Sequence, residues 1–222
     1  MRAPRAKHPR VRGYLFFLAR ILSDSAMTTL RSICVYCGSN AGSKPEYAAA
    51  AKAMGKAIAG RGITLVYGGG KVGLMGALAD AALAAGGRVV GIIPEFLALK
   101  EVAHAGLSEL IVVDSMHTRK AEMERHSDGF IAMPGGIGTM EELFEIWTWS
   151  QLGQHRKPCG LLDAAGYYGH LNAFLDRMAM DGFVNPEHRA MLHHSDSPEA
   201  LLDAFAGYEA PPADIRIKVA QT

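Results

Sequence analysis

The chain has 222 residues, of which 49% are hydrophobic and 20% charged, a composition typical of one soluble globular domain. This is enough apolar material to form a core without disulfides, so small disulfide-stapled scaffolds are excluded. The formal net charge is only +1, so no overall field favours nucleic acid as a partner. No apolar run reaches the roughly 18 residues of a membrane-spanning helix, so we expect no membrane partner.

The first segment of the chain is basic. Residues 1–26 contain six Lys or Arg and one Asp, a net charge of +5, which leaves −4 for the remaining residues. A signal peptide, a presequence and an amphipathic surface helix are all compatible with its short apolar stretch, which Arg20 interrupts. We favour an extension outside the fold, with Met27 as an alternative first residue. The predicted organisation is an extension over 1–28, one nucleotide-binding domain over 29–207 and a tail over 208–222.

Short apolar segments alternate with segments of helical spacing along the rest of the chain, and Gly-rich turns follow several of them. Such alternation predicts an α/β fold, a doubly wound parallel sheet with helices on both faces. Ligands of such sheets bind where loops leave the carboxyl ends of the strands. The predicted strands span residues 32–36, 63–67, 88–93, 110–113, 129–133 and 160–162. The predicted helices span about 44–60, 73–85, 116–126, 138–152, 168–180 and 197–206, and residues 94–109 are expected to form an irregular loop.

Three cysteines, Cys34, Cys37 and Cys159, cannot all pair within one chain. The C-x-x-C spacing of the first two could mark a redox pair. However, Cys34 lies inside a predicted strand rather than at a helix start. We therefore expect buried, reduced thiols, which indicates a reducing compartment and a cytoplasmic location.

The first glycine motif is GGGKVGLMG at residues 68–76. Gly68, Gly70 and Gly73 match the G-x-G-x-x-G fingerprint between a predicted strand and helix, and Glu95 stands near the expected acidic position. Two interpretations are open: a cradle for a phosphate or nucleotide, in which Gly69 and Gly70 contact the ligand, or a tight turn with close helix packing. The preceding small-residue loop at 37–42 is equally open, because Ser39 could reach a ligand or simply lie in a turn.

The second glycine motif is PGGIGTMEE at residues 134–142. Its glycines allow a ligand close to the backbone, and the free amides of the following helix can bind phosphate. Thr139 adds a hydroxyl donor, and Glu142 would be held ionised by the helix dipole. The alternative is structural, since Thr139-x-x-Glu142 also has the spacing of a capping box. Glu141 is the more solvated of the two acids.

Two cations, Arg119 and Lys120, stand near the start of the predicted helix 116–126. Positive charge is unfavourable at a helix N-terminus, so the pair indicates a ligand or an acidic partner, with a plain solvated face as the alternative. His117 and His126 have no third ligand at matching spacing, and we expect no metal site.

Together these segments resemble the Lonely Guy family, the cytokinin riboside 5′-monophosphate phosphoribohydrolases. The resemblance covers about residues 31–206. The matching segments are CGSN at 37–40, YGGGKVGLMG at 67–76, MHTRKAEM at 116–123, PGGIGTMEE at 134–142 and TWSQLG at 148–153. It implies a Rossmann-like fold, a homodimer with the site near the subunit interface, and no cofactor. The implied reaction hydrolyses the N-glycosidic bond of AMP or an N6-substituted AMP to free base and ribose 5-phosphate.

By motif position, the resemblance makes Arg119 and Glu142 the catalytic pair. It makes Gly136, Gly138 and Thr139 the phosphate binders. The loop around Glu101 departs from the family pattern. Further substrate contacts are expected at Ser39, Gly69, Gly70, Glu101, Lys120, Gly135, Ile137, Met140, Glu141 and Thr148.

Two other functions remain open at this point. A non-catalytic nucleotide carrier or sensor could use the same fold, although it would not need both Arg119 and Glu142. A dinucleotide-dependent oxidoreductase is supported only by the fingerprint at 68–73. Family members are often labelled lysine decarboxylases, but the residues around Lys71 and Lys120 show no sign of a pyridoxal phosphate site.

Overall fold

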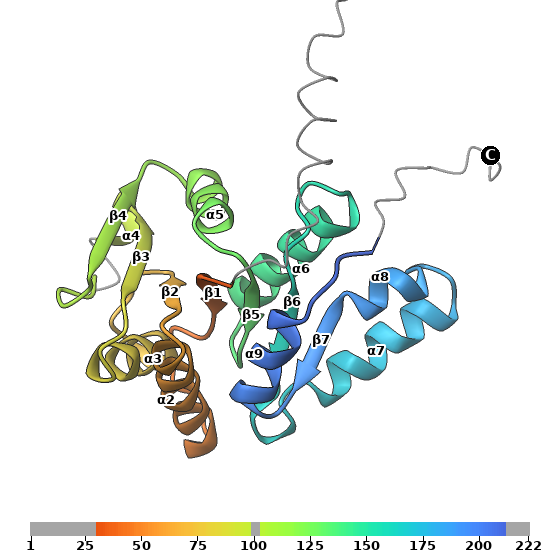
Figure 1. Ribbon diagram of the computed structural model, residues 1–222, viewed down its shortest axis with the longest axis horizontal. Coiled ribbons are helices and arrows are strands. Elements are labelled where there is room, and N and C mark those ends of the chain that lie inside the picture. Colours follow the sequence, from red (N-terminus) through yellow and green to blue (C-terminus); the bar gives the residue numbers. More distant parts are fainter. Residues whose placement is uncertain (1–29, 99–102, 212–222) are drawn as a thin grey trace, which may run out of the picture.

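The computed structural model describes residues 30–98 and 103–211. The predicted extension 1–28, the tail beyond Pro211 and the candidate contact Glu101 lie outside these residues, so those predictions stand as such. The described part contains one sheet of seven strands, all parallel, in the order β4-β3-β2-β1-β5-β6-β7 (Figure 1). Its strands are β1 Ser32–Tyr36, β2 Thr64–Tyr67, β3 Val89–Pro94, β4 Glu109–Val113, β5 Phe130–Ala132, β6 Cys159–Leu162 and β7 Leu192–Ser195.

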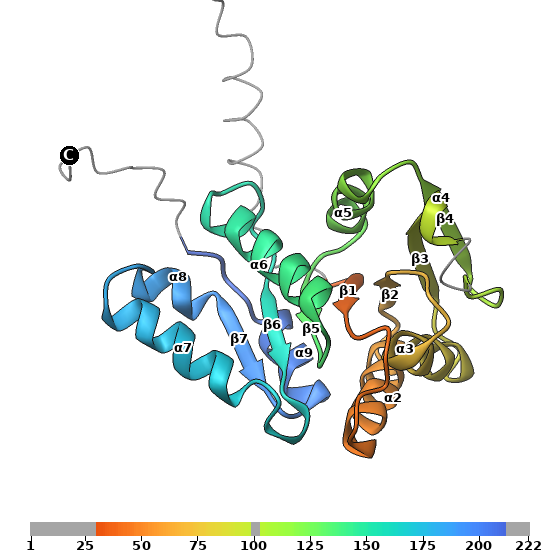
Figure 2. The ribbon, with the colours of Figure 1, turned by 180° about the vertical axis from the view of Figure 1, so that it is seen from behind.

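Helices cover both faces of the sheet, as the sequence predicts (Figures 1 and 2). Helices α2, α3 and α9 pack on one face, and α5, α6 and α7 on the other. None of the helices in the described ranges is long and apolar enough to cross a membrane. The helices are α2 Pro45–Gly60, α3 Gly73–Ala84, α4 Glu95–Ala98, α5 Met116–Arg125, α6 Ile137–Gln151, α7 Gly169–Met180, α8 Pro186–Ala190 and α9 Pro198–Ala206, with a 3₁₀ turn η1 at Ala164–Gly166.

The central strand β1 is buried on both faces, which explains its unbroken apolar sequence. Ile33 and Val35 point to the side of α2 and α3, whereas Cys34 and Tyr36 point to the side of α5 and α6. Cys37 belongs to the first side, so the two cysteines of the C-x-x-C segment lie in different core clusters. All three cysteines are free and buried, and the prediction of buried, reduced thiols is confirmed.

The sequence prediction missed the strand β7, the helices α4 and α8, and the 3₁₀ turn η1. The seventh strand, Leu192–Ser195, was not predicted because its sequence LHHS contains two histidines and lacks an apolar run. It pairs with β6 alone, at the edge of the sheet, where the burial on both faces that marks the central strands is not required. The short helix α4 lies inside the segment predicted to be irregular, and α8 lies where no element was predicted.

The order of the strands in the sheet reverses direction at β1. From β1 the chain winds outward through β2, β3 and β4, and then crosses back to β5 on the other side of β1. In open parallel sheets, this reversal point is where ligands bind, outside the carboxyl ends of the strands. The small-residue loop 37–42 follows β1 and the glycine turn 134–136 follows β5. The topology therefore directs attention to these two loops.

Candidate active site

The three glycine-rich loops meet in direct backbone contact at the carboxyl ends of β1, β2 and β5. The Gly38 amide donates to the Pro134 carbonyl at 3.0 Å, and the Gly38 carbonyl accepts from the Leu74 amide at 3.0 Å. A Cβ atom added at Gly73 would lie 2.3 Å from the Ser39 backbone. Distances this short leave no room for a side chain, so the small residues are required for the loops to approach one another.

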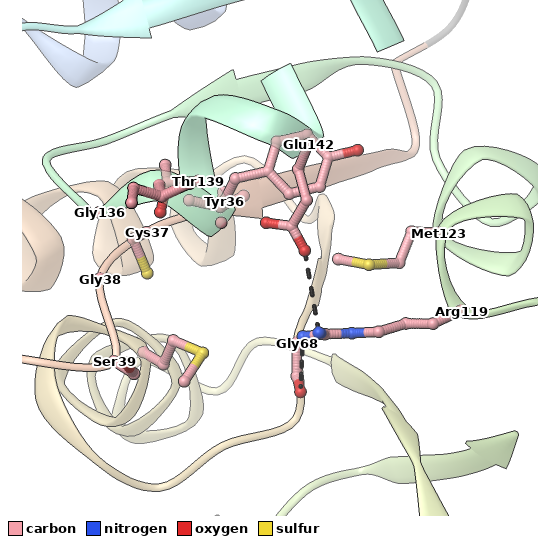
Figure 3. Close-up of a pocket in the computed structure, with 14 residues that line it drawn as sticks. Tyr36, Cys37, Gly38, Ser39, Gly68, Arg119, Met123, Gly136, Thr139 and Glu142 are labelled. Atoms are coloured by element: carbon pink, nitrogen blue, oxygen red, sulfur yellow. Dashed lines mark hydrogen bonds and ion pairs between the residues drawn. The ribbon is translucent and has the colours of Figure 1, made fainter. Parts of the chain in front are cut away.

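A cavity of about 260 Å³ opens beside this junction. Figure 3 shows Arg119 and Glu142 pointing toward one another, with Gly136 and Thr139 at the other end. Its walls come from the ends of β1 and β2, from α3 and α5, and from the start of α6. The lining residues are Val35, Tyr36, Cys37, Gly38, Ser39, Gly68, Met75, Arg119, Met123, Gly136, Ile137, Gly138, Thr139 and Glu142.

Arg119 is a buried cation on α5, 7% exposed, whose direction is fixed by backbone carbonyls. Its Nε donates to the Ile92 carbonyl at 3.1 Å, and its Nη2 donates to the Gly68 carbonyl at 3.3 Å. A Cβ atom at Gly68 would lie 2.1 Å from Nη2. The first glycine of the fingerprint motif therefore makes room for the guanidinium, a contact between residues 51 positions apart.

Glu142 is the partner of Arg119 in the cavity. Its side chain is 12% exposed, and its Oε1 lies 3.9 Å from Arg119 Nη1 (Figure 3). Burial, and next the Glu142 carboxylate, raise the pKa of the Cys37 thiol well above its usual range. Burial and the Glu142 carboxylate also raise the pKa of Cys34 and Tyr36, while Arg119 acts in the opposite direction on Cys34. These three groups are thus held neutral, and Arg119 faces Glu142 as a cation.

The start of α6 has the form of an anion-binding site. Its N-cap is Gly136, which makes no side-chain capping bond. The first amides of an α-helix have no partner within the helix and lie at the positive end of its dipole. Gly136, Ile137 and Gly138 are exposed, and Cβ atoms at the two glycines would meet no atom within 4 Å. These amides are therefore positioned to accept a phosphate group.

The capping-box interpretation of Thr139 and Glu142 is wrong. The helix begins at Ile137, so Thr139 is its third residue and not its cap. Thr139 is buried, and a Cβ atom at Gly135 would lie 2.1 Å from its hydroxyl oxygen. Glu142 consequently lies in the second turn, where a carboxylate cannot cap the helix, and it lines the cavity instead.

Several candidate contacts lie outside the cavity lining, and their assignment to the substrate stays a prediction. Lys120 binds Glu141 and Glu145 at 2.5 and 2.9 Å. Thr148 donates to the Phe144 carbonyl. Gly69 is buried near Ile93 and Leu110, and Gly70 pairs with Ala103. Gly135 lies against Thr139, and Met140 packs against the core on the side of the sheet that α5 and α6 cover.

The structure adds cavity residues that the sequence did not mark as substrate contacts. Tyr36, Cys37, Met75 and Met123 line the cavity, yet each has the apolar or aromatic character of an ordinary core residue. One signal was available. Met123 follows Arg119 by four residues on one helix, so the two share a face.

The chain is similar to known proteins of the family that its motifs resemble. A family model described as "Possible lysine decarboxylase" matches residues 75–205. The cytokinin riboside 5′-monophosphate phosphoribohydrolase of Rhodococcoides fascians is 51% identical over 173 residues, which are 78% of this chain and 87% of that protein. Cytokinin riboside 5′-monophosphate phosphoribohydrolase LOG1 of Arabidopsis thaliana is 46% identical over 178 residues, 80% of this chain and 84% of that protein.

The chain belongs to the Lonely Guy family.

Solved structures share the Rossmann-like fold of this Lonely Guy chain. A molybdenum cofactor binding protein from Rippkaea orientalis superposes with a TM-score of 0.59 at 24% identity, over 79% of this chain and 95% of that one. The molybdenum cofactor carrier protein of Chlamydomonas reinhardtii superposes with a TM-score of 0.60 at 22% identity, over 79% of this chain and 96% of that one. At these identities the likeness concerns the fold alone.

Lys120 of the Lonely Guy motif is poorly suited to the chemistry named in the family description. A lysine that forms a Schiff base must lose its proton readily. Burial lowers the pKa of Lys120, but hydrogen bonds to Glu141 and Glu145 outweigh it and raise the pKa above its usual value. These hydrogen bonds therefore favour the protonated amine.

The cavity thiol gives a first prediction. Because burial raises the pKa of Cys34, Cys37 and Cys159, all three should remain thiols at pH 8 and react with a disulfide reagent at least ~10-fold more slowly than free cysteine. Denaturation in guanidinium should release three reactive thiols per chain, and this measurement is the control. Rapid labelling of the native protein would contradict the burial and the raised thiol pKa described for Cys37.

Proposed function

We propose that the chain hydrolyses the N-glycosidic bond of nucleoside 5′-monophosphates, AMP or an N6-substituted AMP, to free base and ribose 5-phosphate. The observation that carries the proposal is the pairing of Glu142 with Arg119 in one cavity, 3.9 Å apart, beside an uncapped helix start. The relatives named as cytokinin riboside 5′-monophosphate phosphoribohydrolases support it.

The cavity gives the substrate a direction. The 5′-phosphate would bind the amides at the start of α6, with the Thr139 hydroxyl close by. The ribose would then extend toward Glu142, which lies farther along the same helix. The base would reach the end formed by Arg119 and the apolar side chains of Tyr36 and Met123 (Figure 3). Backbone amides at one end suit the phosphate of a nucleotide, and Arg119 with Tyr36 and Met123 at the other end suits its base.

The residues supply what the bond cleavage needs. Breaking the C1′–N9 bond develops positive charge on the ribose ring, and an anionic Glu142 opposes that charge. Glu142 can also take a proton from the attacking water, whose oxygen forms the new bond to C1′. The electron pair of the broken bond goes to the purine, which leaves as the free base after gaining a proton. Arg119 Nη1 is the donor best placed to stabilise charge on the departing base.

The competing functions fit the geometry less well. A carrier or sensor needs to hold a nucleotide but has no use for a buried carboxylate facing the sugar. For a dinucleotide enzyme, the fingerprint should leave space for a pyrophosphate. Here Gly68 receives Arg119, Gly73 packs on Ser39, and Glu95 is exposed on α4, away from the cavity lining. Residues of the protein itself occupy the space in which the dinucleotide would bind.

The assembly and location follow as part of the proposal. From the family resemblance we propose a homodimer with the site near the subunit interface. The Ile137 side chain at the cavity is 90% exposed, and Leu152 at the other end of α6 is 63% exposed, which is consistent with a partner covering this helix. Three free cysteines favour a cytoplasmic location.

The function is tested by product analysis. Purified protein incubated with AMP or isopentenyladenosine monophosphate should release free base and ribose 5-phosphate in equal amounts, measured by chromatography. Glu142→Gln should keep the fold and lower turnover at least ~100-fold, because an electrostatic or acid–base group of this kind contributes that much. Binding of both nucleotides without release of either base would support the carrier instead.

Gly68→Ala tests the position of the Arg119 guanidinium without replacing either charged residue. The new methyl group would lie 2.1 Å from Arg119 Nη2, so Arg119 must shift away from the Gly68 carbonyl. We expect hydrolysis to fall at least ~10-fold, since small misplacements of catalytic groups cost this much or more. Gly60→Ala is the matched control, because its Cβ atom would meet open space. Equal activity of both variants would remove the proposed role of Arg119.

A further inference from the structure

Three consecutive carbonyl groups at the end of β5 each accept a hydrogen bond from a different residue. The Met133 carbonyl accepts from the Tyr168 hydroxyl at 2.6 Å, and the Gly135 carbonyl accepts from the Tyr167 hydroxyl at 2.5 Å. Between them, the Pro134 carbonyl accepts from the Gly38 amide. Each of three successive peptides in the turn that leads into α6 is therefore held by its own hydrogen bond. These peptides immediately precede the amides proposed to bind phosphate.

The turn that carries the two tyrosines is strained, and its partners hold it in place. Ala165 has φ of 53° and ψ of 32°, a left-handed conformation that is costly for a residue with a side chain and persists where the surroundings enforce it. Asp163 supports the turn by accepting from the Tyr168 amide at 2.8 Å. The Tyr167 ring packs edge-on against Tyr47, with ring centres 5.6 Å apart. The turn places two neighbouring hydroxyl groups against the end of β5.

Of the three fixed peptides, the one between Gly135 and Gly136 has most need of support. A peptide plane reverses by rotation about ψ of the residue before it and φ of the residue after it, and glycine allows both. A Cβ atom at Gly136 would meet nothing within 4 Å, so packing at that residue does not oppose the reversal. Since C=O and N–H point in opposite directions in a trans peptide, a reversed plane would present a carbonyl oxygen where an anion needs a donor.

We propose that Tyr167 is a positioning residue for phosphate recognition: its hydroxyl holds the Gly135 carbonyl and thereby directs the Gly136 amide to the anion. This inference rests on the proposed function, whose phosphate subsite it deepens. Tyr167 lies outside the cavity lining and acts only through the peptide. Tyr168 differs in this respect, because the Met133 carbonyl belongs to a peptide with Pro134, which has no N–H to direct.

The test compares three tyrosine variants. Tyr167→Phe removes the hydroxyl and should weaken binding of ribose 5-phosphate about 5- to 10-fold, as expected when one net hydrogen bond sets the fraction of protein in the competent conformation. Tyr168→Phe should lower the melting temperature but keep that affinity within about twofold, because it leaves a buried carbonyl without its donor. Tyr208→Phe is the control, since the Tyr208 hydroxyl is buried without a hydrogen-bond partner in the described part of the chain.

Calorimetry with ribose 5-phosphate and steady-state kinetics with AMP provide the readouts. For Tyr167→Phe we expect a raised Kd and KM with kcat within about twofold, a split that general loosening of the fold would not produce. Unchanged affinity, or equal losses in Tyr167→Phe and Tyr168→Phe, would overturn the inference. If the wild-type protein binds ribose 5-phosphate but does not cleave AMP, the proposed function fails while the affinity comparison still decides the role of Tyr167. A wild-type protein that binds no ribose 5-phosphate would overturn the inference, whereas the release of base from AMP decides the proposed function separately.

Discussion

The site depends on the close approach of three backbone segments around Gly38. Its amide bonds to Pro134 in the loop that follows β5, and its carbonyl bonds to Leu74 in the first turn of α3. A methyl group on Gly73 or Gly135 would collide with this junction. Because the loops meet at backbone distance, α5 and the start of α6 can face one narrow space, and two oppositely charged residues reach it from distant parts of the sequence.

Burial of these charges strengthens their effect on a reacting molecule in the cavity. Arg119 loses most of its contact with water, and two backbone carbonyls replace the hydration of its Nε and Nη2 groups. Its Nη1 lies 3.9 Å from Glu142 Oε1. The two carbonyl bonds are shorter than this contact and hold the direction of the guanidinium. Preorganised charges in such a water-poor cavity act more strongly on a developing charge than they would in water.

The sequence was sufficient to predict most strands and helices along the chain. Central strands buried on both faces are continuously apolar, and most are followed by segments whose apolar residues have helical spacing. It was not sufficient for β7, an edge strand with two histidines. It also left the role of Gly68 open, since the fingerprint alone does not show that the space belongs to an arginine 51 residues later. The cavity wall was missed for a related reason: Tyr36 and Met123 have the character of core residues, and only the fold shows that one side of each lines a cavity.

A crystal structure of the protein with ribose 5-phosphate would test the central claim most directly. The account predicts the phosphate on the amides of residues 136–138, with C1 facing Glu142 and separated from its nearest oxygen by at most one water molecule. In the same structure Arg119 should keep its bonds to the Ile92 and Gly68 carbonyls. A phosphate bound instead at residues 68–70, or a sugar whose C1 lies far from Glu142, would contradict the account.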